Sequence, residues 1–487
     1  MNPPRQSRSG GGIERPVLAW ALLLAALSCL PFLVTAYPQL TDYPSHLARY
    51  HVMLNRAENP FLERYYDFEW IVTGNLGADI LMVPLGTVFG VEVAGWLIGA
   101  LIAPLTALGI ISVEWVLRKR IGVGSLLAFV TIWSPAMAMG FYNFCLSVAL
   151  ALLAFALWVR LEGVSWRWAV FLPIGLAVWL CHASGWGVLG ILVFGYEWHR
   201  RKGLAAFIAP WPLFLPFVPL LLTGGAEHAL NYGRSAVAYK IAIWFKGLRG
   251  ESQDLDIATV TVLLLAILAA LFSRRIDGRL GWAALVLFVL TLAMPRHLGG
   301  GDYADWRLIS VALMIGCLAI DWQVPRWLLF VVPALFLVRL GLTAAAWVEQ
   351  SRQLEADLAA IGYIPEGARV AGAVLTDSQR WSTNPFEHAP SYATVYRDAL
   401  VNSHFAITGI HMLSLDEPDP DFVDPSQRLI RAPSQKIELA AFEPAASADY
   451  LWYFGDREPD SLPAGAEVIF RSDHSLLARL ANSGTAR

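Results

Sequence analysis

The sequence is short of charge, and its four cysteines form no recognisable group. Asp, Glu, Lys and Arg make up only 15% of the 487 residues, whereas 56% are hydrophobic and the mean hydropathy is +0.51. This balance excludes an ordinary soluble enzyme. The sequence has neither a CxxC pair nor a Cys/His cluster, so we predict no zinc site and no disulfides. All the cysteines lie in apolar stretches, at Cys29, Cys145, Cys181 and Cys317.

Neither sign of charge is in excess. Lys plus Arg number 36 against 39 for Asp plus Glu, so no basic excess indicates a nucleic-acid partner and no acidic excess indicates disorder. The chain also shows no internal repeat, which weighs against a transporter built from duplicated halves. The glycine triplet 299–301 lacks the lysine and the strand-to-helix setting of a phosphate-binding loop.

Apolar runs of about 20 residues recur along the chain, and each is long enough to cross a bilayer as a helix. Basic clusters such as Arg118-Lys119-Arg120 and Arg200-Arg201-Lys202 separate these runs and are expected on the cytoplasmic side. The predicted fold class is mainly α, a polytopic membrane helix bundle of about eleven spans. The predicted crossings are 16–36, 93–117, 121–138, 142–160, 167–182, 184–198, 203–222, 257–273, 280–294, 306–320 and 327–347.

The organisation predicted around these spans has three parts. Residues 1–16 form a basic cytoplasmic tail, 17–347 a transmembrane domain and 348–487 a small extracytoplasmic α/β domain. The first outer segment, 37–92, is unusually long, and 76–91 within it is predicted to be an interfacial or re-entrant helix.

Local patterns add detail. Four prolines in the run 203–222 predict a kinked or broken helix. In the tail, Leu354, Leu358 and Ile361 have the spacing of an amphipathic helix. The tail is further predicted to contain strands at 369–375 and 450–454 and a final hairpin over 467–480.

Polar residues directly after the first span are the strongest candidates for chemistry. In Thr41-Asp42-Tyr43-Pro44-Ser45-His46-Leu47-Ala48-Arg49, Asp42 can cap a helix whose first turn tolerates proline. Asp42, His46 and Arg49 then lie on one helix face. One interpretation is a capped helix with surface charges at the membrane. The other is a general base, Asp42, with His46 and Arg49 orienting it or binding a phosphate.

The chain resembles the GT-C class of integral-membrane glycosyltransferases, which includes the aminoarabinose transferase and protein O-mannosyltransferase superfamily. The resemblance rests on Asp42 just after the first span, the long first outer loop, the many spans and the outer C-terminal domain. It implies a polyprenyl-phosphate-linked sugar as donor, Asp42 as the base that deprotonates the acceptor, and inversion at the anomeric carbon. The acceptor is then a glycan, a lipid or a protein.

The second outer loop departs from that class. Many members carry an acid there, but the sequence here is Met139-Gly140-Phe141-Tyr142-Asn143. A metal ion bridged by two acids is therefore not predicted, although a divalent cation stays possible. Asn143 is a candidate for binding a sugar hydroxyl. From the resemblance, the C-terminal domain is expected to cover the cavity and help select the acceptor, and its own polar residues are assigned no catalysis.

Further polar residues lie at outer membrane depth, where polarity is costly and often functional. His182, at a turn between two spans, is either a structural histidine or a substrate ligand. The loop 295–307 supplies further candidates for substrate binding, with Arg296 and Arg307 suited to a lipid phosphate. The alternative is an ion pair, Asp305 to Arg307 or Asp302 to Arg296, that fixes the loop. The full set of substrate-binding candidates is Arg49, Asn143, His182, Arg296, His297, Asp302, Asp305 and Arg307.

Two further segments bear charge near the membrane. Arg339 lies inside the last span, and pairing with a carboxylate of the bundle is the expected solution. The loop 223–256 mixes basic and aromatic residues, as an interfacial or a solvated segment would.

The sequence thus predicts a multi-pass protein of a bacterial inner membrane that transfers a sugar on the periplasmic side. A lipid or glycan transporter, and a non-catalytic subunit of a polysaccharide assembly machine, are the alternatives. Membrane lipids are expected partners, and nucleic acid is not.

Overall fold

A computed structural model of the chain describes residues 14–218, 231–232, 235–298, 302–377, 379–406, 412–416, 420–431 and 436–481. Most of the predicted basic tail, most of the first part of the loop 223–256 and the glycine triplet 299–301 lie outside the described residues. The protein is mainly helical, with a small sheet region toward the C-terminus.

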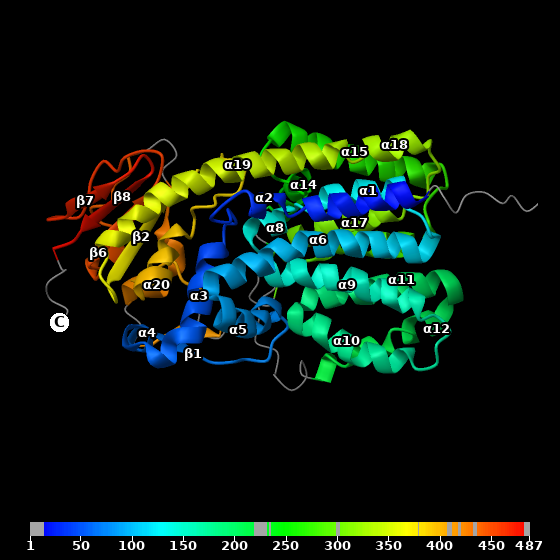
Figure 1. Cartoon of the computed structure of the whole chain (residues 1–487), viewed down its shortest axis with the longest axis horizontal. Coiled ribbons are helices and arrows are strands. Elements are labelled where there is room, and N and C mark those ends of the chain that lie inside the picture. Colours follow the sequence, from blue (N-terminus) through cyan, green and yellow to red (C-terminus); the bar gives the residue numbers. More distant parts are fainter. Residues whose placement is uncertain are drawn as a thin grey trace, which may run out of the picture.

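Long apolar helices run side by side along the molecule and form a bundle (Figure 1). They occupy the apolar runs of the sequence because each run carries few charged residues and ends at polar or basic residues. The helices of the bundle are α1 (Glu14–Leu27), α6 (Val91–Arg118), α9 (Tyr142–Arg160), α10 (Arg167–Cys181), α11 (Ala183–Arg201), α15 (Gln253–Phe272), α16 (Gly278–Ala293), α17 (Ala304–Leu318), α18 (Arg326–Val331) and α19 (Ala334–Leu358).

Helix α9 is the most enclosed of the long helices, packed between α6 and α11. A close approach between α6 and α9 depends on Gly109, since a Cβ there would lie 2.7 Å from the Cβ of Leu152. Among the described helices, four are long and apolar enough to cross a membrane: Val91–Arg118, Tyr142–Arg160, Gln253–Phe272 and the continuous stretch Arg326–Tyr363. These suggest a membrane protein, but the predicted count of eleven spans is not confirmed.

Several predicted spans are shorter or interrupted helices. The run 121–138 is divided into α7 (Val123–Ala128), the 3₁₀ turn η2 (Phe129–Thr131) and α8 (Pro135–Met139). The proline-rich run 203–222 is broken, as predicted, into α12 (Gly203–Ile208) and η3 (Trp211–Phe214). Two more short helices complete the bundle, α2 (Leu30–Leu33) and α14 (Ala236–Phe245).

Arg339 pairs with a carboxylate, as predicted. Its guanidinium contacts the carboxylate of Asp256 at the start of α15 and donates a 2.8 Å hydrogen bond to the carbonyl of Leu248. The indole of Trp381, from the C-terminal domain, donates to the same carboxylate at 2.8 Å. This cluster therefore ties the last bundle helix to both the loop before α15 and the C-terminal domain.

The C-terminal domain contains a mixed sheet of strand order β3-β2-β6-β8-β7, with β5 also pairing β2. Strands β3, β5 and β6 run parallel to β2, whereas β8 is antiparallel to β6 and β7. The predicted strands and final hairpin are confirmed. The strands are β2 (Arg369–Leu375), β3 (Leu400–Val401), β5 (Leu429–Ile430), β6 (Tyr450–Phe454), β7 (Glu467–Arg471) and β8 (Ser475–Arg479).

Short helices cover this sheet and connect its strands. They are η4 (Ala359–Tyr363), η5 (Ala389–Ser391), α20 (Tyr392–Arg397), α21 (Pro420–Val423), η6 (Pro425–Arg428) and η7 (Glu443–Ala446). The amphipathic helix predicted around Leu354 and Leu358 is not separate, because it continues the last bundle helix as the end of α19. One helix therefore leads from the bundle into the domain (Figure 1).

The outer segment 37–92 folds against the C-terminal domain. It comprises α3 (Tyr43–Asn55), η1 (Arg56–Glu58), α4 (Pro60–Tyr65), β1 (Tyr66–Phe68) and α5 (Gly77–Phe89). Strand β1 pairs antiparallel with β4 (Leu413–Leu415). Helix α5, in the segment predicted to be interfacial, has 13 residues and so measures about 20 Å at 1.5 Å per residue, less than a hydrocarbon core of about 30 Å.

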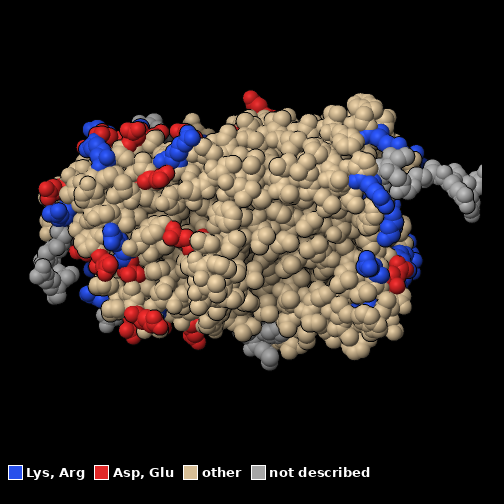
Figure 2. Space-filling view, in the orientation of Figure 1, with Lys and Arg blue, Asp and Glu red and all other residues tan. Residues whose placement is uncertain are grey.

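Charge is divided between the two ends of the molecule (Figure 2). On the face shown, a broad band with almost no charged side chains separates a mixed acidic and basic end from an end with mainly basic side chains. The latter, here called the basic end, includes Arg118, Arg160, Arg200 and Arg201 in the last turns of α6, α9 and α11. Such a band between two polar ends is what a bilayer requires.

Candidate functional site

Asp42 lies where the outer segment, a turn of the bundle and the C-terminal domain meet. It is the N-cap residue of α3, and Pro44 stands in the first turn as predicted. The predicted side-chain cap is not made, so the carboxylate is not used by its own helix. Instead the backbone N–H of Asp42 donates to the carbonyl of Met139 at 2.9 Å, and Gly140 leaves room with an ideal Cβ 3.4 Å from that of Asp42.

The Asp42 carboxylate has surroundings suited to a general base. Its side chain is 15% exposed. Burial and the charge of Glu387 raise its pKa to about 7, against the smaller lowering influence of Arg428 and Arg307. A carboxyl with a pKa near neutrality is available to take up a proton at physiological pH.

His388, from the turn before η5, stands next to this carboxylate. Its Nε2 lies 3.7 Å from Oδ1 of Asp42 and 2.8 Å from a guanidinium nitrogen of Arg428. Because a guanidinium can only donate, Nε2 must accept, and Nδ1 then carries the proton. Burial and Arg428 hold the pKa of His388 well below its usual value. His388 is therefore neutral and forms no ion pair with Asp42.

Ser45 completes a chain of hydrogen bonds that begins at Arg428. Nδ1 of His388 lies 2.6 Å from the Ser45 hydroxyl, which donates to the carbonyl of Ser403 at 2.5 Å. Arg428 itself donates to Glu387 at 2.9 Å. The first turn of α3 is thus fixed to the C-terminal domain, and Arg428 is held where its charge reaches Asp42.

Arg307 is a second cation whose charge reaches Asp42, although it comes from the bundle helix α17. Its guanidinium lies over the ring of Phe141, 3.8 Å from the centroid. Its Nε is buried and has no hydrogen-bond partner among the residues that the structure describes. A guanidinium with an unpaired hydrogen-bond donor is suited to bind an incoming anion such as a phosphate.

His46 and Arg49 do not gather around Asp42 in the predicted way. The His46 ring stacks on the rings of Tyr50 and Tyr142, with centroids 6.1 and 6.2 Å away, and lies near Phe405. Its predicted role beside the base stays a prediction. Arg49 turns to α5 and forms a buried ion pair with Asp79.

Asn143 is hydrogen-bonded to the carboxylate of the Arg49–Asp79 ion pair. Its Nδ2 donates to Asp79 at 3.3 Å and to the carbonyl of Asn75 at 2.7 Å, while its Oδ1 accepts from the backbone N–H of Ala78 at 2.5 Å. These bonds engage both ends of the amide. Asn143 and Arg49 therefore fix the start of α5 in this structure, and their predicted sugar and phosphate contacts would require exchange of partners.

Ion pairs occupy most charged residues in the described parts of the loop 295–307, namely 295–298 and 302–307. Arg296 donates two hydrogen bonds to Asp302, at 2.9 and 3.0 Å, and Nδ1 of His297 lies 3.2 Å from the same carboxylate. Asp305 pairs with Lys240 of α14 rather than with Arg307. Arg296 therefore forms the ion pair that the sequence offered as the alternative. Arg307 does not pair with Asp305, so its guanidinium is available to another partner.

His182 acts as a helix cap. Its Nδ1 accepts a 3.0 Å hydrogen bond from the backbone N–H of Ser184 at the start of α11, and its ring packs edge-on against Phe144. This is the structural role that the sequence left open for it.

The donor set does not fit a divalent cation. Within the described ranges, no three His, Cys, Asp or Glu side chains gather in a way that could hold a metal ion. Asp42 is faced by two guanidinium groups, and Asp79 is already neutralised by Arg49. The guanidinium groups at both carboxylates would repel a metal cation.

The partners that sequence reasoning missed are Glu387, His388 and Arg428. They lie in the tail, to which no chemistry was assigned, and Ser45 and His388 are 343 residues apart. No spacing rule links such positions.

Comparison of the chain with models of protein families, with curated proteins and with solved structures finds no match.

Proposed function

We propose that the protein is an inverting membrane glycosyltransferase that moves a sugar from a polyprenyl-phosphate donor to an acceptor hydroxyl. The observation that carries the proposal is a largely buried Asp42, with a pKa near 7, which the charges of two guanidinium groups from different parts of the chain reach. A base and cations are sufficient for this reaction because the lipid phosphate is a good leaving group. The resemblance to the GT-C class supports the same assignment.

In the proposed mechanism, Asp42 removes the proton from the acceptor hydroxyl as its oxygen attacks the anomeric carbon. The bond from that carbon to the phosphate oxygen breaks, and the electron pair leaves with the lipid phosphate, so no proton is needed by the leaving group. Arg307 and Arg428 face the carboxylate and stabilise the departing negative charge. Asp42 in its ionised form is the active one.

The proposal includes an orientation. The basic end lies in the cytoplasm of a bacterial inner membrane, and the opposite end, with Asp42 and the C-terminal domain, faces the periplasm. The eleven-span arrangement and the periplasmic acceptor belong to this proposal. A donor then enters laterally from the outer leaflet.

The test is the mass of glycan and lipid-linked products in cells that carry the wild type, Asp42→Asn or no protein, at matched membrane levels. Asn keeps the shape of Asp and removes the base. We expect Asp42→Asn to reproduce the deletion, with a product lighter by one sugar. The matched control is Asp67→Asn, because Asp67 is in the same outer segment but its side chain is 57% exposed.

Two results would contradict the proposal. If cells with Asp42→Asn made wild-type products, Asp42 would not be the base, and a subunit without catalysis would be favoured. An accumulating donor of unchanged mass on the wrong side of the membrane would favour transport instead.

A further inference from the structure

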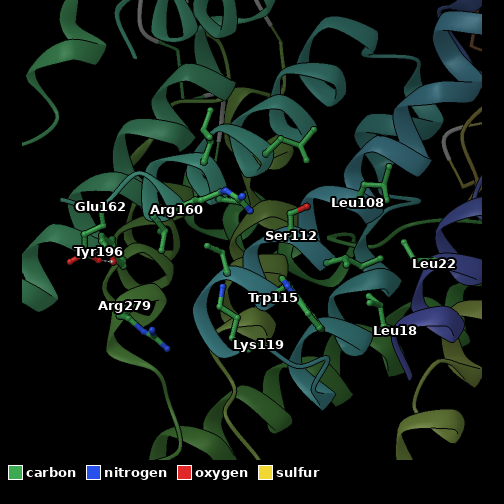
Figure 3. A pocket seen from close by; sticks show the side chains of 16 residues that line it. Leu18, Leu22, Leu108, Ser112, Trp115, Lys119, Arg160, Glu162, Tyr196 and Arg279 are labelled. Atoms are coloured by element: carbon green, nitrogen blue, oxygen red, sulfur yellow. Dashed lines mark hydrogen bonds between the residues drawn. The ribbon is translucent and has the colours of Figure 1, made fainter. Parts of the chain in front are cut away.

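A cavity of about 960 Å³ lies at the basic end, at the opposite side of the bundle from Asp42. Helices α1, α6 and α9 provide most of its wall, and Figure 3 shows the side chains that line it. One side is apolar, with Leu18 and Leu22 of α1 and Leu108 of α6. A cavity of this size is at the upper end of small-molecule sites.

Two cations lie among the lining side chains without an anionic partner. Lys119 is the left-handed residue that ends α6, and Arg160 is in the last turn of α9. Both are exposed, and neither has a side-chain hydrogen bond or ion pair within the described part of the chain. Trp115, also in the lining and 36% exposed, adds an indole donor beside them.

The acid in the lining does not cancel these charges. Glu162 forms an ion pair with Arg200 and accepts a 2.6 Å hydrogen bond from the hydroxyl of Tyr196. The third cation of the lining, Arg279, is already bound to Asp277. The cavity therefore combines an apolar wall with a local excess of two positive charges.

We propose that this cavity binds an anionic phospholipid of the adjacent leaflet, with acyl chains against the leucines and the phosphate between Lys119 and Arg160. The occupant follows from charge complementarity and from the apolar wall: a free phosphate would leave the leucines in contact with water, and a zwitterionic lipid would bring its own ammonium group beside the two cations. Cations at helix C-termini also complement the helix dipole, but that effect needs no cavity. A variant that obstructs the cavity without changing a charge therefore distinguishes lipid binding from a helix-dipole role of Lys119 and Arg160.

The experiment is native mass spectrometry of the full-length protein from vesicles of equal parts phosphatidylglycerol and phosphatidylcholine. We expect the wild type to retain one phosphatidylglycerol preferentially. Lys119→Gln with Arg160→Gln should reduce that preference by roughly thirtyfold, since two basic groups near an anionic headgroup are lost.

The matched control removes two charges elsewhere. Arg274→Gln with Arg275→Gln takes two exposed basic residues from the loop between α15 and α16, outside the cavity, and should retain the preference. A second variant, Ser112→Phe, places an aromatic ring in the cavity, which narrows it, and leaves every charge in place. It should displace the lipid although Lys119 and Arg160 remain.

Four results would overturn the inference: no retained lipid on the wild type, equal retention of the two lipids, equal effects of the two double variants, or full retention by Ser112→Phe. Competition by inorganic phosphate alone would reduce the site to a phosphate site. Retention of an isoprenyl phosphate from cell membranes in place of the phospholipid would contradict the proposed occupant. None of these readings depends on transferase activity.

Discussion

Asp42 and Asp79 are two carboxylates at the same end of the molecule, with opposite relations to their neighbours. Asp79 is fully buried, in direct contact with Arg49 and hydrogen-bonded to Asn143. The charges of two guanidinium groups also act on the pKa of Asp42, but its nearest basic side chain is a neutral histidine 3.7 Å away. A satisfied carboxylate holds helices together, whereas one that lacks a direct partner remains free to react.

The largest effect is expected from breaking the satisfied pair. Asp79→Asn leaves the Arg49 guanidinium buried beside a neutral amide and should lower the free energy of unfolding by about 3–5 kcal/mol. Thermal melting of the purified protein in detergent measures this. The double variant Arg49→Met with Asp79→Leu should recover most of the loss, and an unchanged melting temperature for Asp79→Asn would show that the pair is not stabilising.

The next effect is the pH dependence of sugar transfer. Because the pKa of Asp42 is about 7, the fraction of ionised base, and so the rate, should fall about tenfold for each pH unit below that value and level off above it. Initial rates in membranes between pH 5 and 9 give the profile. A profile that is flat across pH 7 would assign the proton transfer to another group.

A smaller effect is expected on stability, where the Asp42 and Asp79 variants should differ in sign. Burial raises the pKa of Asp42 from 3.8 to about 7, so the folded protein binds more protons than the unfolded chain in that window and loses stability as the pH rises through it. Asp42→Asn removes this loss. Its melting temperature should exceed that of the wild type at pH 8 and match it at pH 4, the opposite of the result for Asp79→Asn.

The smallest expected effect is a shift of the profile by Glu387→Gln. The charge of Glu387 raises the pKa of Asp42, and Glu387 also engages Arg428. Removal of that charge lowers the pKa of Asp42, so the rise in rate should move to lower pH. A shift to higher pH would mean that Glu387 acts mainly by holding Arg428 in place.

The apolar runs predicted most of the helices, because a long stretch without charge has few alternatives to a helix of the bundle. Helix α9, for example, coincides with the predicted run 142–160. The run 121–138 is interrupted at Ser134-Pro135, a break that its hydropathy does not reveal. Hydropathy reports burial but not where a buried segment changes direction.

The site could be predicted only in part. The position of Asp42 after an apolar run was visible in the sequence, and so was the start of α3. The partners of charged residues were not, because Arg49 meets Asp79 only through the packing of α5 on α3. His388 and Arg428 depend on a tertiary contact that no local pattern encodes.

The setting of Asp42 is built from both ends of the polypeptide, with Ser45 and His388 separated by 343 positions. During synthesis, the carboxylate emerges early, while Arg428 leaves the ribosome only after the whole bundle has been made. The growing chain therefore holds an unfinished centre until Arg428 has been added, and a product that stops before His388 carries the aspartate without either of these two partners.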